Sequence, residues 1–442
     1  MTTENSLRPS GLALAPLLLF VAIFLGTGVY LHYQGVDYAF YQLPAPVAIL
    51  PAIVLALYID HKLRQSSLDS SLASLIEGMG NNKVITMCLI YLLAGAFSSV
   101  AKASGGVDAV VYLGLDLIPA PLVVAGLFLI SAIVATAMGT SMGTIGAIAP
   151  IALGLTDSIS IDPAIIAGAV VGGAMFGDNL SFISDTTIAS TRTQGAELKD
   201  KFRENLIFAI PAAVICLVIY TYLGYQTPAE ITSEKQANPL LAIPYFMIIA
   251  LAISGVNVFL VLLLGVLFSA ATGAFVGSYE LAGLGKDIYA GFSSMQEIFL
   301  LSMLIGGLSE LMRRQGGLDF LVGKLNKVLQ LFTKRKDGPS NQAAIAGLAF
   351  TTNLAVANNT VAIIITGDTA KQLGNEGEVL PKRSASLLDI FSCIAQGLVP
   401  YGAQALLAAA TFSLSPLEVV SHVWYCFVLA IVSVLVIKLR KS

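Results

Sequence analysis

Long apolar stretches, separated by short polar ones, recur along the whole chain. Most are close to the roughly 20 residues that an α-helix needs to cross a bilayer. The pattern therefore predicts an all-α polytopic membrane protein with about ten transmembrane helices. The predicted spans are residues 11–31, 44–60, 84–101, 163–190, 205–223, 240–254, 257–277, 295–312, 384–413 and 417–437.

Two further apolar stretches, residues 120–155 and 342–372, are too long for one span and are interrupted centrally by small and polar residues. We predict that each forms a re-entrant hairpin, which enters and leaves the membrane on the same side. Hydroxyl and amide groups at the tips would bind a cation or a solute, although small residues also serve helix packing. The candidate tip residues are Thr140, Ser141 and Thr144 in the first hairpin, and Thr351, Thr352, Asn353, Asn358, Asn359 and Thr360 in the second.

Two shorter segments, residues 68–79 and 318–332, repeat their apolar residues at three- and four-residue spacing. This spacing is typical of amphipathic helices that lie on a membrane surface. Ordinary loop helices are the alternative interpretation.

Composition agrees with a membrane environment. Hydrophobic residues make up 56% of the 442 residues and charged residues only 12%, against about 25% charged in an ordinary soluble domain. The cysteines and histidines are scattered without the paired spacing of a metal or disulfide site. Basic residues occur only in short loops, so we expect the lipid bilayer as a partner and no nucleic acid.

The two halves of the chain share a pattern at a constant offset of 211 residues. Ser98 pairs with Ser309, and Asp178 with Asp389. Internal repeats with a binding site at their interface are a recurrent plan in secondary transporters. We therefore predict N-terminal scaffold helices in residues 1–83, a first repeat in 84–226, a connector with linking helices in 227–294 and a second repeat in 295–442.

Loop charges indicate that the repeats are inverted. Residues 313–337 hold seven basic residues and the matching 102–119 only one, whereas 191–204 hold four and their counterparts 402–415 none. Lys and Arg concentrate on the cytoplasmic side of short loops, so equivalent loops would face opposite sides. This places both termini in the cytoplasm and the chain in a bacterial-type inner (plasma) membrane.

The densest polar cluster inside an apolar stretch is GDNLSFISDTT, residues 177–187. Glycine weakens a helix, while Asp, Asn and Ser offer the backbone alternative hydrogen bonds, so we expect the helix to break here. A carboxylate at the bilayer centre costs about 2.5–3.5 kcal/mol on insertion scales, which favours a function for both aspartates as Na⁺ ligands. The predicted cation or proton ligands are Asp178, Asn179, Ser181, Ser184, Asp185 and Thr186.

Asp389 is the counterpart of Asp178 at the 211-residue offset. A protonatable carboxylate beside a cation site would exchange H⁺ for Na⁺, since both ions compete for the same charge. The alternative is that Asp389 is an ion-pair partner of Lys382 or Arg383.

The segment GDNLSFISDTT resembles the NhaC family of sodium/proton antiporters, and the similarity extends to residues 139–144 and 199–205. The resemblance implies the ion transporter superfamily fold, with inverted repeats, paired hairpins, a homodimer held by scaffold helices and elevator-like movement. The family's antiporters tend to carry Lys where this chain has Asn179. That difference removes a positive charge and leaves the transported species open.

We expect a cation-coupled secondary active transporter that carries out Na⁺/H⁺ antiport by an elevator-type mechanism, with Na⁺ and H⁺ as its only ions and no further cofactor. The alternative is Na⁺- or H⁺-coupled transport of a small amino acid or carboxylate. We do not expect an enzyme, because the Gly-x-Gly-Asp segment of intramembrane aspartyl proteases is absent at Asp178 and Asp389. An ATP-driven pump is disfavoured, because no phosphate-binding loop is present.

Overall fold

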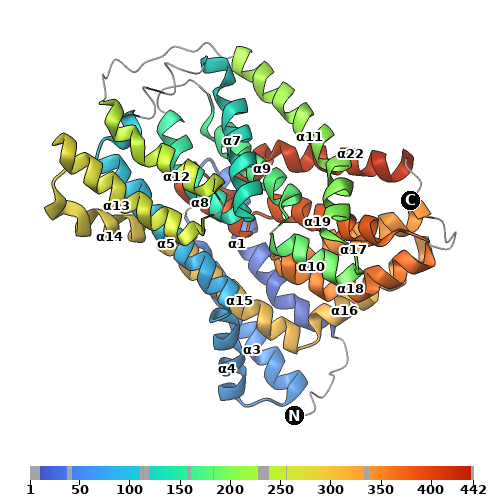
Figure 1. The fold of residues 1–442 in the computed structure, drawn as a ribbon. Helices are drawn as coiled ribbons and strands as arrows, with labels where there is room; N and C mark the ends of the chain where they lie inside the picture. The colour runs from blue at the N-terminus through green and yellow to red at the C-terminus, as the bar shows by residue number, and fades with distance from the viewer. Residues whose placement is uncertain are drawn as a thin grey trace. The chain divides into compact units, whose positions relative to one another are not determined.

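The computed structural model describes residues 10–36, 42–109, 113, 119–156, 161–182, 184–226, 238–254, 256–332 and 338–439. Every regular element in these ranges is a helix (Figure 1). Contacts divide the chain into two compact units: Met1–Cys88 with Gln296–Lys334, and Leu89–Met295 with Arg335–Ser442. The four predicted segments follow other boundaries and stay a prediction.

Seven helical segments in the described ranges are long and apolar enough to cross a membrane, and two bent helix pairs raise the count to nine. A polytopic helical membrane protein is therefore confirmed, while the count of ten spans is not. The seven segments are Gly11–Leu31, Ala45–Lys62, Asn82–Ala103, Pro163–Gln194, Leu198–Gln226, Val258–Val276 and Pro381–Phe412.

The first unit contains both predicted amphipathic helices, as α4 and α16. α4 packs against α15 where glycines allow close approach, since a Cβ on Gly78 would lie 2.5 Å from the Gly306 carbonyl oxygen. The helices of this unit are η1 (Gly11–Leu14), α1 (Ala15–Tyr33), α2 (Ala45–Ala48), α3 (Leu50–Arg64), α4 (Leu68–Met79), the first residues of α5 (Asn82–Ala103), α15 (Gln296–Arg314) and α16 (Gly317–Phe332).

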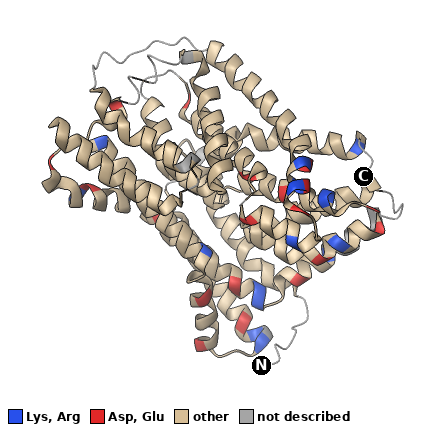
Figure 2. Ribbon diagram, in the orientation of Figure 1, with Lys and Arg blue, Asp and Glu red and all other residues tan. Residues whose placement is uncertain are grey.

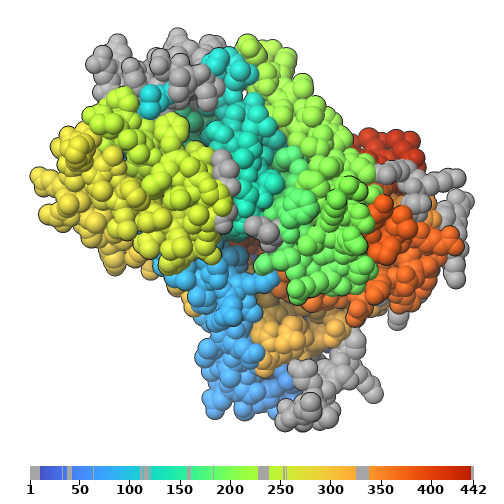
Figure 3. Space-filling view, in the orientation of Figure 1, coloured from blue at the N-terminus to red at the C-terminus, as the bar shows by residue number. Residues whose placement is uncertain are grey.

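The second unit holds the remaining helices, including α14, which the apolar pattern did not predict. α12 and α13, yellow-green in Figure 3, lie at its surface. Its helices are the rest of α5, η3 (Ala120–Leu122), α7 (Val123–Met138), α8 (Ser141–Thr156), α9 (Pro163–Leu180), α10 (Asp185–Gln194), α11 (Leu198–Gln226), η4 (Pro239–Ala242), α12 (Ile243–Ile253), α13 (Val258–Val276), η5 (Leu281–Gly283), α14 (Leu284–Ser294), α17 (Gly338–Val356), α18 (Asn359–Glu376), α19 (Pro381–Leu398), α20 (Ala403–Phe412), α21 (Pro416–His422) and α22 (Trp424–Leu439).

The core of the second unit is built around the two broken spans, α9–α10 and α19–α20. In the apolar 18-residue window of each, 83% of the first and 72% of the second are buried within the protein, against 33–56% for the other candidate spans. α7 and α8, which pack on α9, carry no charged residue and are tan in Figure 2. The broken spans are thus shielded from lipid and can carry polar side chains in the membrane interior.

Both predicted hairpin stretches are broken, as expected. Gly139 separates α7 from α8 with φ 69°, and Ala357 separates α17 from α18 with φ 52°. The second break lies at the later part of the predicted tip, next to Asn358 and Asn359, while Thr351, Thr352 and Asn353 belong to α17.

The span predicted over residues 384–413 corresponds to the candidate span Pro381–Phe412, but its helix is interrupted, which the apolar pattern did not predict. The chain leaves the helix after Leu398 and enters α20 at Ala403. Pro400 explains the break, because proline has no backbone N–H and disfavours a helical residue before it.

The helix boundaries also correct the predicted register. α5 and α15 end 211 residues apart, but α18, α19, α20 and α21 begin 218 residues after α8, α9, α10 and α11. The longer connection that contains α16 accounts for the difference. Counted from these helix starts, Asp178 aligns with Gln396 and not with Asp389, so the predicted offset of 211 does not hold for these helices, and the repeat itself stays a prediction.

Candidate ion-binding site

The predicted interruption in the 163–190 span is confirmed. α9 ends at Leu180, Ser181 is extended (φ −73°, ψ 139°), and the Ser184 hydroxyl caps α10 by accepting from the Thr187 amide. Asp178 and Asn179 lie in the last turn of α9, before the break. Ile183, in the middle of the motif, falls outside the described residues.

Asp178 meets the first predicted hairpin. Its side chain is 5% exposed, and its Oδ2 accepts a hydrogen bond of 2.9 Å from the hydroxyl of Ser141, the first residue of α8. Asp178 forms no ion pair with any basic residue that the structure describes. A buried carboxylate without a counter-charge is costly, so this position favours a bound proton or cation.

Thr140 lies in the same break and Thr144 in the first turn of α8, and both hydroxyls bond to the backbone. The Thr140 hydroxyl accepts from the Gly143 amide at 3.3 Å, and the Thr144 hydroxyl donates to the Thr140 carbonyl at 3.0 Å. Ser141 is thus the predicted tip residue that the structure brings to Asp178.

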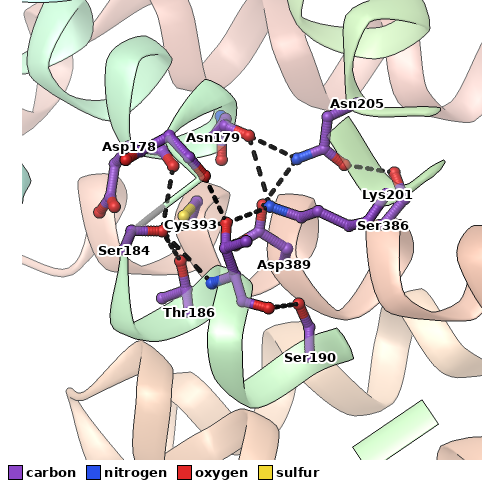
Figure 4. Close-up of polar contacts among 12 residues, drawn as sticks. Asp178, Asn179, Ser184, Thr186, Ser190, Lys201, Asn205, Ser386, Asp389 and Cys393 are labelled. Carbon is purple, nitrogen blue, oxygen red and sulfur yellow. Dashed lines mark hydrogen bonds and ion pairs between the residues drawn. The ribbon is translucent and has the colours of Figure 1, made fainter. Parts of the chain in front are cut away.

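Asp389 is fully buried and carries its own counter-ion (Figure 4). Its Oδ2 lies 2.7 Å from Lys201 Nζ and accepts from Asn205 Nδ2 at 2.7 Å. The predicted alternative partners were wrong, because Arg383 instead pairs with Glu204 at 2.8 Å. Lys201, counted as a loop charge in the topology argument, is 1% exposed.

The Lys201–Asp389 ion pair is tied to the α9–α10 break. Lys201 Nζ donates to the Thr187 hydroxyl at 2.6 Å, and Asn205 Nδ2 donates to the Asn179 carbonyl at 2.6 Å. The Ser386 hydroxyl of α19 donates to Asn205 Oδ1 at 2.6 Å. These bonds fix the ends of α9 and α10 to α11 and α19, as the dashed lines in Figure 4 show.

The remaining predicted ligands of the motif lie around the same break. Asp185 is the first residue of α10 and is exposed, in contrast to Asp178, while Thr186 is buried with its hydroxyl 3.1 Å from that of Ser184. The carbonyl of Ser181 accepts from the Thr187 hydroxyl at 2.8 Å. Na⁺ binding by Asp185 stays a prediction.

The second predicted tip packs against α19 near Asp389. Asn353 Nδ2 donates to the Ser392 carbonyl at 2.7 Å, and Asn359 Nδ2 lies 3.9 Å from the sulfur of Cys393. The other residues of this tip have local roles: Asn358 caps α18 through the Val361 amide, Thr351 donates to the Gly347 carbonyl, the Thr360 amide donates to Asn359, and Thr352 is buried in α17.

Comparison with known protein families identifies the family to which the chain belongs. The model of the Na⁺/H⁺ antiporter family matches residues 9–225 and 236–439. The chain belongs to this family. Membership supports a transporter over an enzyme at the level of the family.

Three relatives match nearly the full length. Identity is 26% to the Na⁺/H⁺ antiporter NhaC of Alkalihalophilus pseudofirmus, over 89% of each chain. It is 25% to a malate-2H⁺/Na⁺-lactate antiporter of Bacillus subtilis, over 93% of this chain and 92% of that one. It is 24% to the arginine/ornithine antiporter ArcD of Halobacterium salinarum, over 97% and 91%.

Two solved structures align over most of the chain at 12% identity. They are MtrF of Neisseria gonorrhoeae, with a TM-score of 0.40 over 99% of this chain and 96% of that one, and the YdaH transporter of Alcanivorax borkumensis, with 0.38 over 97% and 98%. These scores are too low to compare the folds.

Sequence reasoning missed several polar residues that build the site of this antiporter-family member. Lys201 and Asn205 are one helical turn apart on α11, within the stretch of residues 199–205 that resembles the family. That spacing could have identified them as one pair of side chains on one helix face. Gln396 follows Asp389 at helical spacing, but the 211-residue register hid its alignment with Asp178, and Gln404 had no signal of this kind.

Proposed function

We propose that this member of the Na⁺/H⁺ antiporter family exchanges Na⁺ for H⁺ across the inner (plasma) membrane of a bacterial-type cell. One observation carries the proposal: Asp178 is buried, forms no ion pair with the described residues, and accepts a hydrogen bond from the Ser141 hydroxyl at the α7–α8 break. Na⁺ and H⁺ compete for such a carboxylate. When each ion displaces the other, the protein exchanges them. The names of the NhaC relatives support this function.

In this proposal the Na⁺ ligands are oxygens of the α9–α10 break. Helix C-termini and unwound carbonyls coordinate Na⁺ in transporters with broken helices, and Asp178 lies in the last turn of α9. Asp185 supplies a second carboxylate, and Asn179, Ser181, Ser184 and Thr186 supply neutral oxygens. Asp389 is already neutralised by Lys201, so Asp178 is the stronger candidate for the carboxylate that exchanges ions.

We further propose ten spans and two re-entrant hairpins in two inverted repeats, with elevator-type movement in a homodimer and both termini in the cytoplasm. The helix starts that recur at 218 residues support the repeat. Loop charges support the inversion. Large apolar side chains on the outside of α13 suit contact with lipid or with a second copy: Phe259, Leu260, Leu263, Leu267, Phe268 and Phe275.

The alternative proposal is Na⁺- or H⁺-coupled transport of a small amino acid or carboxylate. The names of the malate/lactate and arginine/ornithine relatives favour an organic solute within the same family. Asn353 of α17 and Asn359 of α18 would contact this solute on the two sides of the α17–α18 break. In this alternative Na⁺ alone would move no protons.

Reconstituted liposomes with a pH-sensitive dye inside distinguish the two functions. A Na⁺ pulse that moves protons in the absence of other solutes supports antiport. Silence with Na⁺ alone, followed by proton movement or uptake when pooled amino acids or carboxylates are added, overturns it in favour of the alternative.

A further inference from the structure

A chain of hydrogen bonds connects Asp178 to the α19–α20 break. Ser141 Oγ donates to Asp178 Oδ2 at 2.9 Å, Gln404 Nε2 donates to Ser141 Oγ at 3.1 Å, and Gln396 Nε2 donates to Gln404 Oε1 at 2.7 Å. All four side chains are buried, with at most 5% of each residue exposed. Ser141, the first residue of α8, thus links the two broken spans by hydrogen bonds.

The carboxylate gives this chain of bonds a direction. An ionised carboxylate only accepts hydrogen bonds, so Ser141 must donate to it, and each amide must then donate toward Asp178. The last acceptor, Gln396 Oε1, is left over. It is buried and has no hydrogen-bond partner among the residues that the structure describes. A buried unpaired oxygen costs about 1–3 kcal/mol unless a ligand satisfies it.

Gln396 occupies in the second broken span the place that Asp178 occupies in the first. Each lies two residues before the last residue of its helix, in α19 and α9. The carbonyl end of a helix carries a partial negative charge that favours cations. The Gln396 side chain folds over the break, since a Cβ on Gly402 would lie 3.2 Å from its Nε2.

We infer that the α19–α20 break is a second, uncharged binding position for the transported cation, with Gln396 Oε1 as a ligand. An amide oxygen and backbone carbonyls form a neutral oxygen shell, which suits a monovalent hard cation such as Na⁺ and is a poor site for a divalent one. Gln404 and Ser141 act as positioning residues, because their hydrogen bonds toward Asp178 engage Gln396 Nε2 as a donor and leave Gln396 Oε1 for a ligand. The inference rests on the proposed Na⁺ transport.

Na⁺-dependent thermal stabilisation of the purified protein in detergent tests this site without relying on transport. Gln396→Met keeps the side-chain length and removes the oxygen. We expect the apparent Na⁺ affinity to fall by about tenfold or more, equivalent to about 1.4 kcal/mol. Gln315→Met is the matched control, because Gln315 is also buried, donates to a backbone carbonyl and leaves its Oε1 without a partner among the described residues.

The outcomes separate this inference from the proposed function. Unchanged Na⁺ affinity in Gln396→Met overturns the second site and leaves Na⁺/H⁺ antiport standing. A similar loss in Gln315→Met also overturns it, since the effect would then come from any buried glutamine. A wild-type protein that Na⁺ does not stabilise at any pH overturns both.

A second variant keeps the inference testable if Gln396→Met does not fold. Gln396→Glu retains the shape and the oxygens but adds a negative charge, so we expect Ca²⁺ to stabilise this variant and not the wild type. A Ca²⁺ and Na⁺ response identical to that of the wild type overturns the inference, because a glutamine that only packs the break would not set cation preference.

Discussion

The two buried aspartates of the second unit have different electrostatic partners. Asp389 shares its Oδ2 with the Lys201 ammonium and the Asn205 amide, whereas the Asp178 carboxylate accepts a hydrogen bond from the neutral Ser141 hydroxyl and forms no ion pair with the described residues. A buried charge is stabilised only by a close counter-charge and hydrogen bonds. The charge of Asp389 is therefore already neutralised by Lys201, although its Oδ1 has no hydrogen-bond partner among the described residues. Asp178 has no such ion pair, so it is the carboxylate that gains most from an external cation or proton.

The Lys201–Asp389 pair leads to a prediction of stability. Lys201→Met leaves the Asp389 charge buried and unpaired, so we expect a loss of about 3–5 kcal/mol in the free energy of unfolding. Replacing both partners, as Lys201→Met with Asp389→Leu, should recover much of this loss. Thermal unfolding in detergent measures both.

The matched control for this pair is Lys199→Met, on the same helix, where the side chain is exposed. We expect it to unfold like the wild type. A Lys201→Met protein as stable as the control would show that the ion pair does not hold the α9–α10 break in place.

Among the elements, the close approach of α7 and α9 positions Asp178. Gly173 and Gly177 face α7, where a Cβ would lie 2.2 Å from the Phe128 carbonyl oxygen and 2.4 Å from the Ala132 carbonyl oxygen, respectively. No side chain fits at these distances. The last turn of α9 therefore reaches its position beside Ser141 only because glycine occupies the contact surface.

Gly173→Ala should push α9 away from α7. Overpacking of this kind costs about 1–3 kcal/mol, and we expect a lower thermal midpoint together with weaker Na⁺ stabilisation. Gly126→Ala, in α7, is the control, because its Cβ would meet no atom within 4 Å and alanine favours helices. Equal midpoints for the two variants would contradict this packing argument.

The helices and the polar break of α9 could be predicted from the sequence because apolar length and the GDNLSFISDTT motif are local signals. The ion-pair partner of Asp389 could not be predicted, because Lys201 lies 188 positions away along the chain and stands among charges that resemble those of a loop. The predicted offset of 211 residues does not hold for the later helices for a similar reason. A longer connection around α16 shifts the second set of helices by seven residues, and no local pattern marks it.

For the whole molecule, membership of the Na⁺/H⁺ antiporter family and seven to nine candidate spans in the described ranges place the chain in a membrane. In the proposed topology an even number of spans puts both termini on the same side, and the loop charges assign that side to the cytoplasm. The burial of Lys201 removes one charge from the loop count, but Arg192, Lys199 and Arg203 remain in the stretch on which the argument depends.

We expect a green fluorescent protein fused to the C-terminus to fluoresce in intact bacterial cells and an alkaline phosphatase fused there to be inactive, because the first folds in the cytoplasm and the second only outside it. The reverse pattern would contradict the proposed orientation. A tag at the N-terminus tests the other end in the same way.

Proton release on Na⁺ binding tests most directly whether both ions compete for Asp178. Na⁺ is added to purified protein in detergent with almost no buffer, and the change in pH is recorded. We expect the wild type to release protons, the Lys199→Met control to match it, and Asp178→Asn to release none although it folds. Na⁺ binding without proton release in the wild type, or undiminished release in Asp178→Asn, would contradict exchange at this carboxylate.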